Sequence, residues 1–164
     1  MFDTVSGLPV HILVVHAAVV LIPLMALVTL AFTLRPRWRP GLSWAVLGNL
    51  AGLVAAFVAK ESGEKLQARL SSQAGELVAA DHGDLGSKLP YFALAALLGS
   101  VIAWFLVGRA TSADGTRSAS VTAVATSVVL VLALGGAATF WTVRVGDSGS
   151  RAAWEDTIAN TKAP

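Results

Sequence analysis

Four apolar runs constrain this chain more than any other feature, because none of them contains Asp, Glu, Lys or Arg. The runs cover residues 10–34, 42–59, 89–107 and 121–143. A helix rises about 1.5 Å per residue, so runs of this length match the roughly 30 Å of hydrocarbon in a bilayer. Backbone polar groups must be satisfied internally there, which favours helices. The sequence therefore predicts an all-α integral membrane protein, a single four-helix bundle spanning residues 1–164.

The composition supports a lipid environment. Of 164 residues, 55% are hydrophobic and 13% are charged, and the mean hydropathy is +0.69, whereas soluble domains carry about 25% charged residues. Twelve basic and ten acidic residues form no recurring basic stripe, which argues against a nucleic-acid partner. The chain has no cysteine, which excludes disulfides and cysteine-ligated iron–sulfur clusters. The expected partner is the lipid bilayer.

The longest polar stretch, residues 60–88, separates the second and third runs. Apolar side chains recur in it at roughly helical spacing between charged ones, at Leu66, Leu70, Leu77 and Val78. This pattern is typical of an amphipathic helix on a membrane surface, and Gly83 and Gly86 are typical stop signals. We expect a short amphipathic surface helix here, between spans two and three.

The polar tail, residues 144–164, follows the fourth run. Gly146 and Gly149 flank Asp147 and indicate a tight turn. In one interpretation the backbone N–H groups of this outer turn, with Arg144 and Asp147, bind an anion or cap a site; in the other, it is an exit turn that docks the tail.

Basic residues predict the orientation. The first loop carries Arg35, Arg37 and Arg39 and no acidic residue, and the third loop has Arg109 and Arg117 against Asp114. The positive-inside rule places both loops in the cytoplasm, with the N-terminus, residues 60–88 and the tail outside. All three histidines and most acidic residues then share the outer end.

The histidines are the candidate site residues. His11 and His16 lie five residues apart, so an ideal helix points them about 140° away from each other. His16 lies about two turns into the first run, which makes it the better candidate for an inward ligand. His82 would approach from the surface segment, with His11 in reserve and with Glu61 and Glu64 as possible carboxylate ligands.

Several interpretations of this site stay open. Imidazole suits haem iron, zinc and copper, so His16, His82 and His11 are candidates for binding haem b. A zinc or copper site could use His11, His16, His82, Glu61 and Glu64. A proton-linked or quinone-headgroup site would have His16 donate a hydrogen bond. In the purely structural interpretation, His16 bonds another helix and no cofactor is bound.

Gly48 and Gly52 form a small-xxx-small pair in the second run. Such pairs allow another helix to approach closely, and Asn49 beside them is expected to hydrogen-bond between helices. We expect this face to pack against a helix, either within the chain or in a partner.

The opening of the first run, His11-Ile-Leu-Val-Val15-His16-Ala-Ala18, resembles the His-Pro-x-x-Val-His-Phe-Pro motif of a bacterial membrane family, domain of unknown function 2231. His11, Val15 and His16 match the motif, while Ile12, Ala17 and Ala18 depart from it. Three further pieces are similar to the family: Ser62-Gly63-Glu64, His82-x-x-Leu85-Gly86 and Val143-Arg-Val-Gly-Asp-Ser-Gly149.

The resemblance covers nearly the whole chain and implies a multi-pass protein of the bacterial cytoplasmic membrane. Some members look to be fused to a Rieske-type iron–sulfur domain, which implies electron transfer. This chain has no cysteine to ligate such a cluster.

These observations support three functional hypotheses. The first is a redox accessory protein with haem or a metal at the outer end. The second is a non-catalytic subunit or scaffold of a larger membrane redox complex, or a homo-oligomer, with Gly48 and Gly52 at an interface. The third is a metal or proton transporter, which the absence of carboxylates within the runs disfavours. No nucleotide-binding, hydrolase or metalloprotease motif is present, so we assign no catalytic residue and expect no autonomous enzyme.

Overall fold

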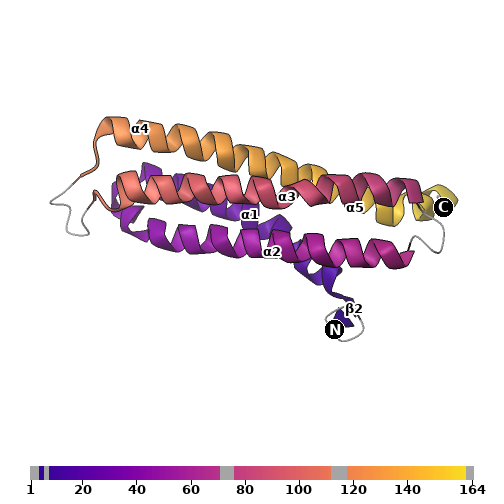
Figure 1. The fold of residues 1–164 in the computed structure, drawn as a ribbon. Coiled ribbons are helices and arrows are strands. Elements are labelled where there is room, and N and C mark those ends of the chain that lie inside the picture. The colour runs from indigo at the N-terminus through magenta and orange to yellow at the C-terminus, as the bar shows by residue number, and fades with distance from the viewer. Residues whose placement is uncertain (1–3, 6–7, 71–75, 112–117, 162–164) are drawn as a thin grey trace.

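The computed structural model describes residues 4–5, 8–70, 76–111 and 118–161. The elements are two short strands, β1 (Thr4–Val5) and β2 (Leu8–Pro9), then α1 (Val10–Leu34), the 3₁₀ turn η1 (Pro36–Gly41), α2 (Leu42–Leu70), α3 (Glu76–Ala103), the π-helical turn η2 (Trp104–Gly108), α4 (Val121–Leu130), the π-helical turn η3 (Val131–Gly135) and α5 (Gly136–Asn160). The strands pair antiparallel ahead of α1. α4, η3 and α5 continue into one another, so they form a single long rod (Figure 1).

The predicted four-helix membrane bundle is confirmed. Four helical stretches of the described chain are long and apolar enough to cross a membrane: Val10–Leu34, Pro36–Ala68, Asp81–Gly108 and Val121–Trp154. Large apolar side chains such as Leu27 and Phe105 lie exposed on the outside. The core between the helices is built largely from alanine, including Ala18, Ala56 and Ala93. Small residues let helix backbones approach closely. In a bilayer, where lipid tails are as apolar as the helix surface, such close van der Waals packing drives helix association.

Gly48 and Gly52 lie where α2 packs against α1. A Cβ at position 48 would overlap the Met25 side chain, and one at position 52 would lie 3.3 Å from Cγ1 of Ile22. Asn49 donates from Nδ2 to the Thr29 hydroxyl, 3.1 Å away on α1. The expected close approach and interhelical hydrogen bond therefore occur, and the partner helix belongs to the same chain.

The separate amphipathic surface helix was a wrong prediction. Residues 60–70 continue α2 and residues 76–88 open α3, so both helices extend as a pair (Figure 1). Gly83 shows the reason: a Cβ there would lie 2.7 Å from Oε1 of Gln67 on α2. This glycine serves helix contact, and tertiary packing outweighs its weak helix propensity.

The outer turn at Gly146–Gly149 was also a wrong prediction, because α5 is helical throughout this stretch. Asp147 accepts from Nε of Arg151 one helical turn later, at 3.0 Å, and both side chains are exposed. Arg144 is exposed as well. Arg144 and Asp147 therefore lie on the surface of a helix and cap no turn.

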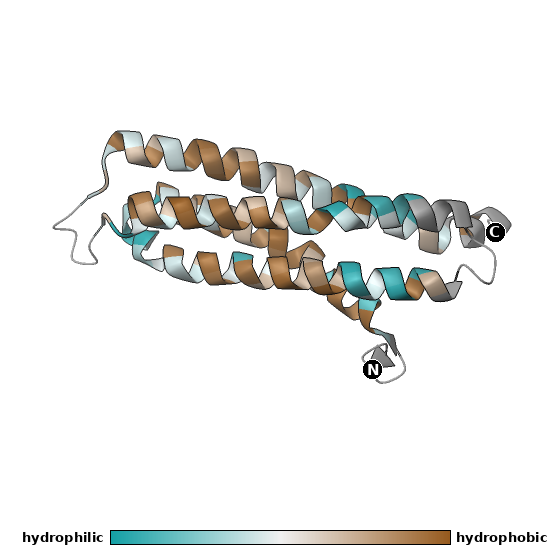
Figure 2. Ribbon diagram, viewed as in Figure 1, coloured by the Kyte–Doolittle hydropathy of each residue, from teal (hydrophilic) through white to brown (hydrophobic). Residues whose placement is uncertain are grey.

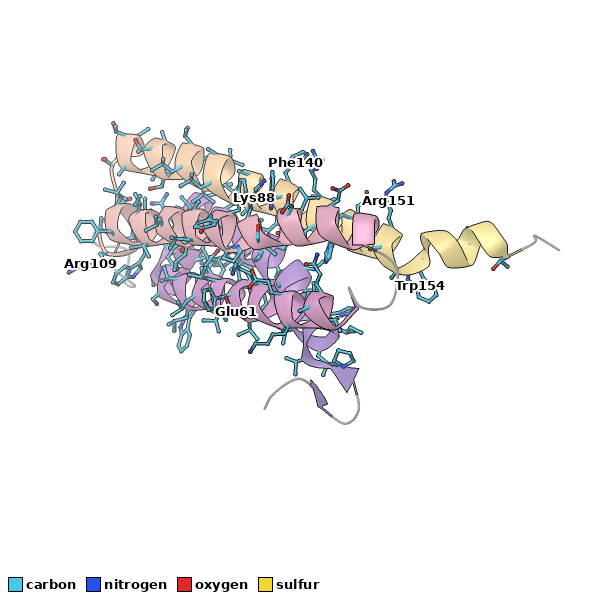
Figure 3. All side chains as sticks on the ribbon, turned by 45° about the vertical axis from the view of Figure 1, so that its right-hand side comes forward. Glu61, Lys88, Arg109, Phe140, Arg151 and Trp154 are labelled. Carbon is cyan, nitrogen blue, oxygen red and sulfur yellow. The ribbon has the colours of Figure 1, made fainter. Side chains whose placement is uncertain are left out.

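The two ends of the bundle differ in character. The start of α1, the end of α2, the start of α3 and the end of α5 lie at one end, which we call the polar end, and η1 and η2 lie at the other, the arginine end (Figure 1). Figure 2 shows hydrophilic residues along α2, α3 and α5 towards the polar end, with hydrophobic residues through the middle. Figure 3 shows Arg109 at one end of the bundle and Arg151 and Trp154 towards the other end. The start of α1 and the end of α5 thus share an end, as predicted, and the assignment of that end to the outer face stays a prediction.

Candidate histidine site

His11 lies in the first turn of α1 and faces α2. Its Nδ1 is 2.9 Å from the backbone oxygen of Ala59. The ring rests directly on Gly63, because a Cβ at that position would lie 2.9 Å from Cε1 of His11. A carbonyl oxygen only accepts hydrogen bonds, so Nδ1 of His11 carries the proton.

His82 lies in α3 and faces α5 in the same manner. Its Nδ1 is 3.0 Å from Oγ of Ser148, and that hydroxyl donates to the backbone oxygen of Val145 at 2.9 Å. Because the single hydroxyl proton of Ser148 is used in that bond, Nδ1–H of His82 is the donor to Oγ. The ring rests on Gly149, where a Cβ would lie 2.9 Å from Cε1.

The two rings meet at the polar end. Their centroids are 6.2 Å apart and their planes make an angle of 73°. α1, α2, α3 and α5 thus contribute His11, Gly63, His82 and Gly149, a set that we call the histidine layer. The two glycines leave the room that the two rings occupy.

The hydrogen bonds of the layer set its chemistry. With the proton held on Nδ1, a neutral imidazole presents an unprotonated Nε2. Metal-binding histidines commonly have this arrangement, in which the other ring nitrogen donates to a carbonyl or similar acceptor and fixes the ring orientation. His11 and His82 therefore each offer one lone pair for a metal or a proton.

Apolar and aromatic contacts underlie the layer. Nε1 of Trp141 donates to the backbone oxygen of Leu85 at 3.0 Å, which ties α5 to α3. The Trp141 ring stacks on Phe92 with centroids 4.5 Å apart. Val14 and Leu85 pack against the buried core here. The histidine layer therefore adjoins a closely packed apolar core.

His16 does not join this layer, and the expectation that it points inward was wrong. It is exposed, and its Nδ1 bonds the backbone oxygen of Ile12 in its own helix at 2.5 Å. The buried positions of α1 are Ala18, Ile22, Thr29 and Thr33. His11 lies seven residues before Ala18, two helical turns along the same face. The buried positions set the phase of α1 and favour His11, whereas depth in the apolar run, the criterion available from the sequence, favoured His16.

The predicted carboxylate ligands, Glu61 and Glu64, pair with a lysine. Nζ of Lys60 is 3.1 Å from Glu61 and 2.8 Å from Glu64, so both carboxylates pair with this lysine near the surface. Among the described residues no group of three or more His, Cys, Asp or Glu side chains is arranged to hold a metal ion. Of the predicted ligands, the structure brings His11 and His82 together.

Sequence reasoning missed Gly63, Ser148 and Gly149 as members of the site. A signal was present, because Gly63 and Gly149 lie in two of the segments that resemble the family. A glycine within a helix costs about 1 kcal/mol relative to alanine, so it is a candidate for a close contact; Gly63 and Gly149 make one, whereas Gly86 and Gly146 do not.

The fold and the site define a class: a four-span helical membrane protein with two histidines facing each other at the polar end. The chain belongs to the family described as predicted membrane protein (DUF2231), which matches residues 7–162. That match includes every residue of the histidine layer. No curated protein and no solved structure matches the chain.

Proposed function

We propose that the chain binds one transition-metal ion between His11 and His82 and serves as a metal-carrying accessory protein in membrane redox chemistry. One observation carries the proposal: two imidazoles from different helices, each anchored through Nδ1, have centroids 6.2 Å apart. The anchors leave Nε2 of both rings as the available donors.

The separation suits a shared ion. A metal lies about 2 Å from an imidazole nitrogen, so two rings that bind one ion from opposite sides have centroids about 6 Å apart. Rings that bind at a tetrahedral angle would lie closer together. The ring separation of 6.2 Å leaves room for one ion bound by both rings from opposite sides.

The donor set favours copper. Zinc is almost always held by four ligands in structural sites and by three protein ligands in catalytic ones. Cu(I) has a filled d shell and is stable with two nitrogen donors in line, and imidazole is an accepted copper ligand. Copper also cycles between two oxidation states, which fits the redox role that we infer.

Haem b is the alternative that the packing disfavours. A porphyrin between the rings requires a wide apolar cleft. Both rings lie against the backbone of neighbouring helices at Gly63 and Gly149, and the core beneath is closed by alanine contacts and by Trp141 on Phe92. A single ion needs no such cleft.

Copper loading of the purified protein tests the proposal. The protein in detergent is titrated with Cu(I) under anaerobic reducing conditions against a chromophoric chelator, beside His11→Ala, His82→Ala and His16→Ala. We expect one copper per chain in the wild type and in His16→Ala, and loss of tight binding in the other two. His16→Ala is the matched control, since this histidine lies on the same helix but outside the layer.

Two outcomes would overturn the proposal. One is copper binding that survives both His11→Ala and His82→Ala. The other is a Soret band in protein from haem-supplemented cells that disappears in those two variants, which would replace the copper ion by haem.

A further inference from the structure

The arginine end carries a second arrangement of polar groups, independent of the histidine layer. Arg35, Arg37 and Arg39 lie in or next to η1, and Arg109 follows η2. The acidic side chains that the structure describes are Glu61, Glu64, Asp81, Asp84 and Asp147; they lie in the last part of α2, the first part of α3 and in α5, away from η1 and η2. Within the described residues, the arginines therefore have no carboxylate beside them.

Arg39 is the central residue of this end. Its side chain is buried, at 5% exposure, and Nε donates to the backbone oxygen of Thr33 at 3.1 Å. A guanidinium carries five N–H donors, so this bond uses one of them. The fully buried side-chain atoms without a partner in the described chain are Thr111 Oγ1 and Ser127 Oγ. Among the described residues Arg39 makes no second hydrogen bond, and its terminal nitrogens are not among these fully buried atoms, so they reach the protein surface.

Thr111 supplies the second observation. Its hydroxyl is buried without a hydrogen-bond partner, two residues after Arg109. η2, which ends three residues before Thr111, touches η1, because a Cβ at Gly108 would lie 3.4 Å from the backbone oxygen of Arg39. A buried hydroxyl normally has a partner, and leaving it without one is costly. Donors from both segments thus lack an acceptor.

Aromatic contacts set the depth of this end in the membrane. The Arg35 guanidinium lies 4.4 Å from the centroid of Trp38, and that of Arg109 lies 5.2 Å from Phe105 and 5.8 Å from Trp104. Tryptophan is enriched at the headgroup level of bilayers. The arginines stacked on these rings therefore lie at the level of lipid phosphates.

We propose that the arginine end binds the phosphate of an anionic phospholipid, with Arg39 as its buried donor. Arginine donates two parallel hydrogen bonds to phosphate, and basic pockets between membrane helices bind anionic headgroups. In this proposal the Thr111 hydroxyl is a further donor, and Arg35 and Arg109 add positive charge at the same end. This site is separate from the histidine layer and does not depend on bound metal.

Native mass spectrometry and thermal unfolding of the delipidated protein test this site. The probes are phosphatidylglycerol, phosphatidylcholine and inorganic phosphate. We expect phosphatidylglycerol to remain bound to the wild type and to raise its unfolding temperature, whereas phosphatidylcholine and inorganic phosphate do neither. Arg39→Gln is expected to abolish the preference for phosphatidylglycerol, and Arg37→Gln, an exposed neighbour, to preserve it.

Thr111→Val gives an answer even if Arg39→Gln fails to fold. It replaces a hydroxyl that has no protein partner by an isosteric apolar group, so the fold is expected to persist. Loss of one hydrogen bond to a charged phosphate should weaken phosphatidylglycerol binding roughly tenfold. Unchanged phosphatidylglycerol affinity in Thr111→Val and in a folded Arg39→Gln would overturn the proposal, as would equal stabilisation by inorganic phosphate.

Discussion

At the scale of single residues, the acceptors of Nδ1 decide what the histidines can do. His11 uses a backbone carbonyl, Ala59, which no substitution removes. His82 uses a side chain, Ser148, whose own proton goes to Val145. The orientation of His82 can therefore be altered without touching the ring.

Ser148→Ala is expected to weaken copper binding while the protein stays folded. It removes the acceptor that holds the Nδ1–H tautomer of His82, and loss of such a supporting bond lowers metal affinity about 10- to 100-fold. Chelator competition measures the change. Ser150→Ala is the control, since Ser150 is exposed and, among the described residues, bonds the Gly146 backbone oxygen of its own helix. Equal affinities in the two variants would contradict this role of Ser148.

At the scale of helices, glycines at the polar end act as contact points. Gly63, Gly83 and Gly149 each lie within a helix and face a ring or an amide of a neighbouring helix at distances that exclude a Cβ. These contacts hold the polar end of α2 (residues 60–70) and the polar start of α3 (residues 76–88) against their neighbouring helices. The same contacts position the two histidines.

Gly149→Ala and Gly146→Ala form a matched pair within α5. A Cβ at 149 would lie 2.9 Å from the His82 ring, while one at 146 meets no atom within 4 Å. Overpacking at 149 should lower the free energy of unfolding by about 1–3 kcal/mol and weaken copper binding. Gly146→Ala should raise it by about 0.5–1 kcal/mol through helix propensity. Unfolding in detergent measures both, and equal effects would count against the contact.

At the scale of the whole molecule, the four spans form one antiparallel bundle with opposed chemical ends. The polar end holds the histidine layer, and the arginine end holds η1, η2 and their arginines (Figure 1). In our proposals, the polar end binds a metal ion and the arginine end binds lipid headgroups. Both the packing and the orientation are testable, because the chain has no native cysteine.

The packing of α3 against η3 is tested by a disulfide. A Cβ at Gly99 would lie 3.6 Å from Cβ of Leu134, within the range of disulfide-bonded cysteines. The double substitution Gly99→Cys and Leu134→Cys is expected to cross-link on oxidation in membranes. Pairing Gly99→Cys with Gly136→Cys serves as the control, since position 136 has open space around it. Failure of the first pair to cross-link would contradict the packing of α3 against η3.

The orientation is tested by cysteine labelling of intact cells. Positive-inside asymmetry predicts that the arginine end faces the cytoplasm. Ala152→Cys, exposed on α5 at the polar end, should react with a membrane-impermeant maleimide. Arg37→Cys in η1 should react only after the membrane is opened. The reverse pattern would invert the orientation and place the histidine layer on the cytoplasmic side.

The sequence by itself determined the four spans. Charge-free runs of this length cross a bilayer as helices, because a helix forms all its backbone hydrogen bonds within its own segment. The bounds of α1, Val10–Leu34, match the expected span, as does the pairing of Gly48 and Gly52 with another helix. The sequence also named His11 and His82 as candidate ligands and gave the angle that separates His11 from His16.

Only the tertiary structure decided what the polar segments do and which histidine faces inward. In a local sequence pattern glycine predicts the end of a helix. At Gly83 and Gly149, contact with a neighbouring helix stabilises the structure by more than the low helix propensity of glycine destabilises it. The carboxylates Glu61 and Glu64 resembled ligands in sequence, yet Lys60 lies within one helical turn and pairs with both. Helix phase, fixed by Ala18 and Ile22 against their neighbours, placed His11 in the layer and left His16 outside it. Such choices depend on contacts between helices distant in sequence, which local patterns do not contain.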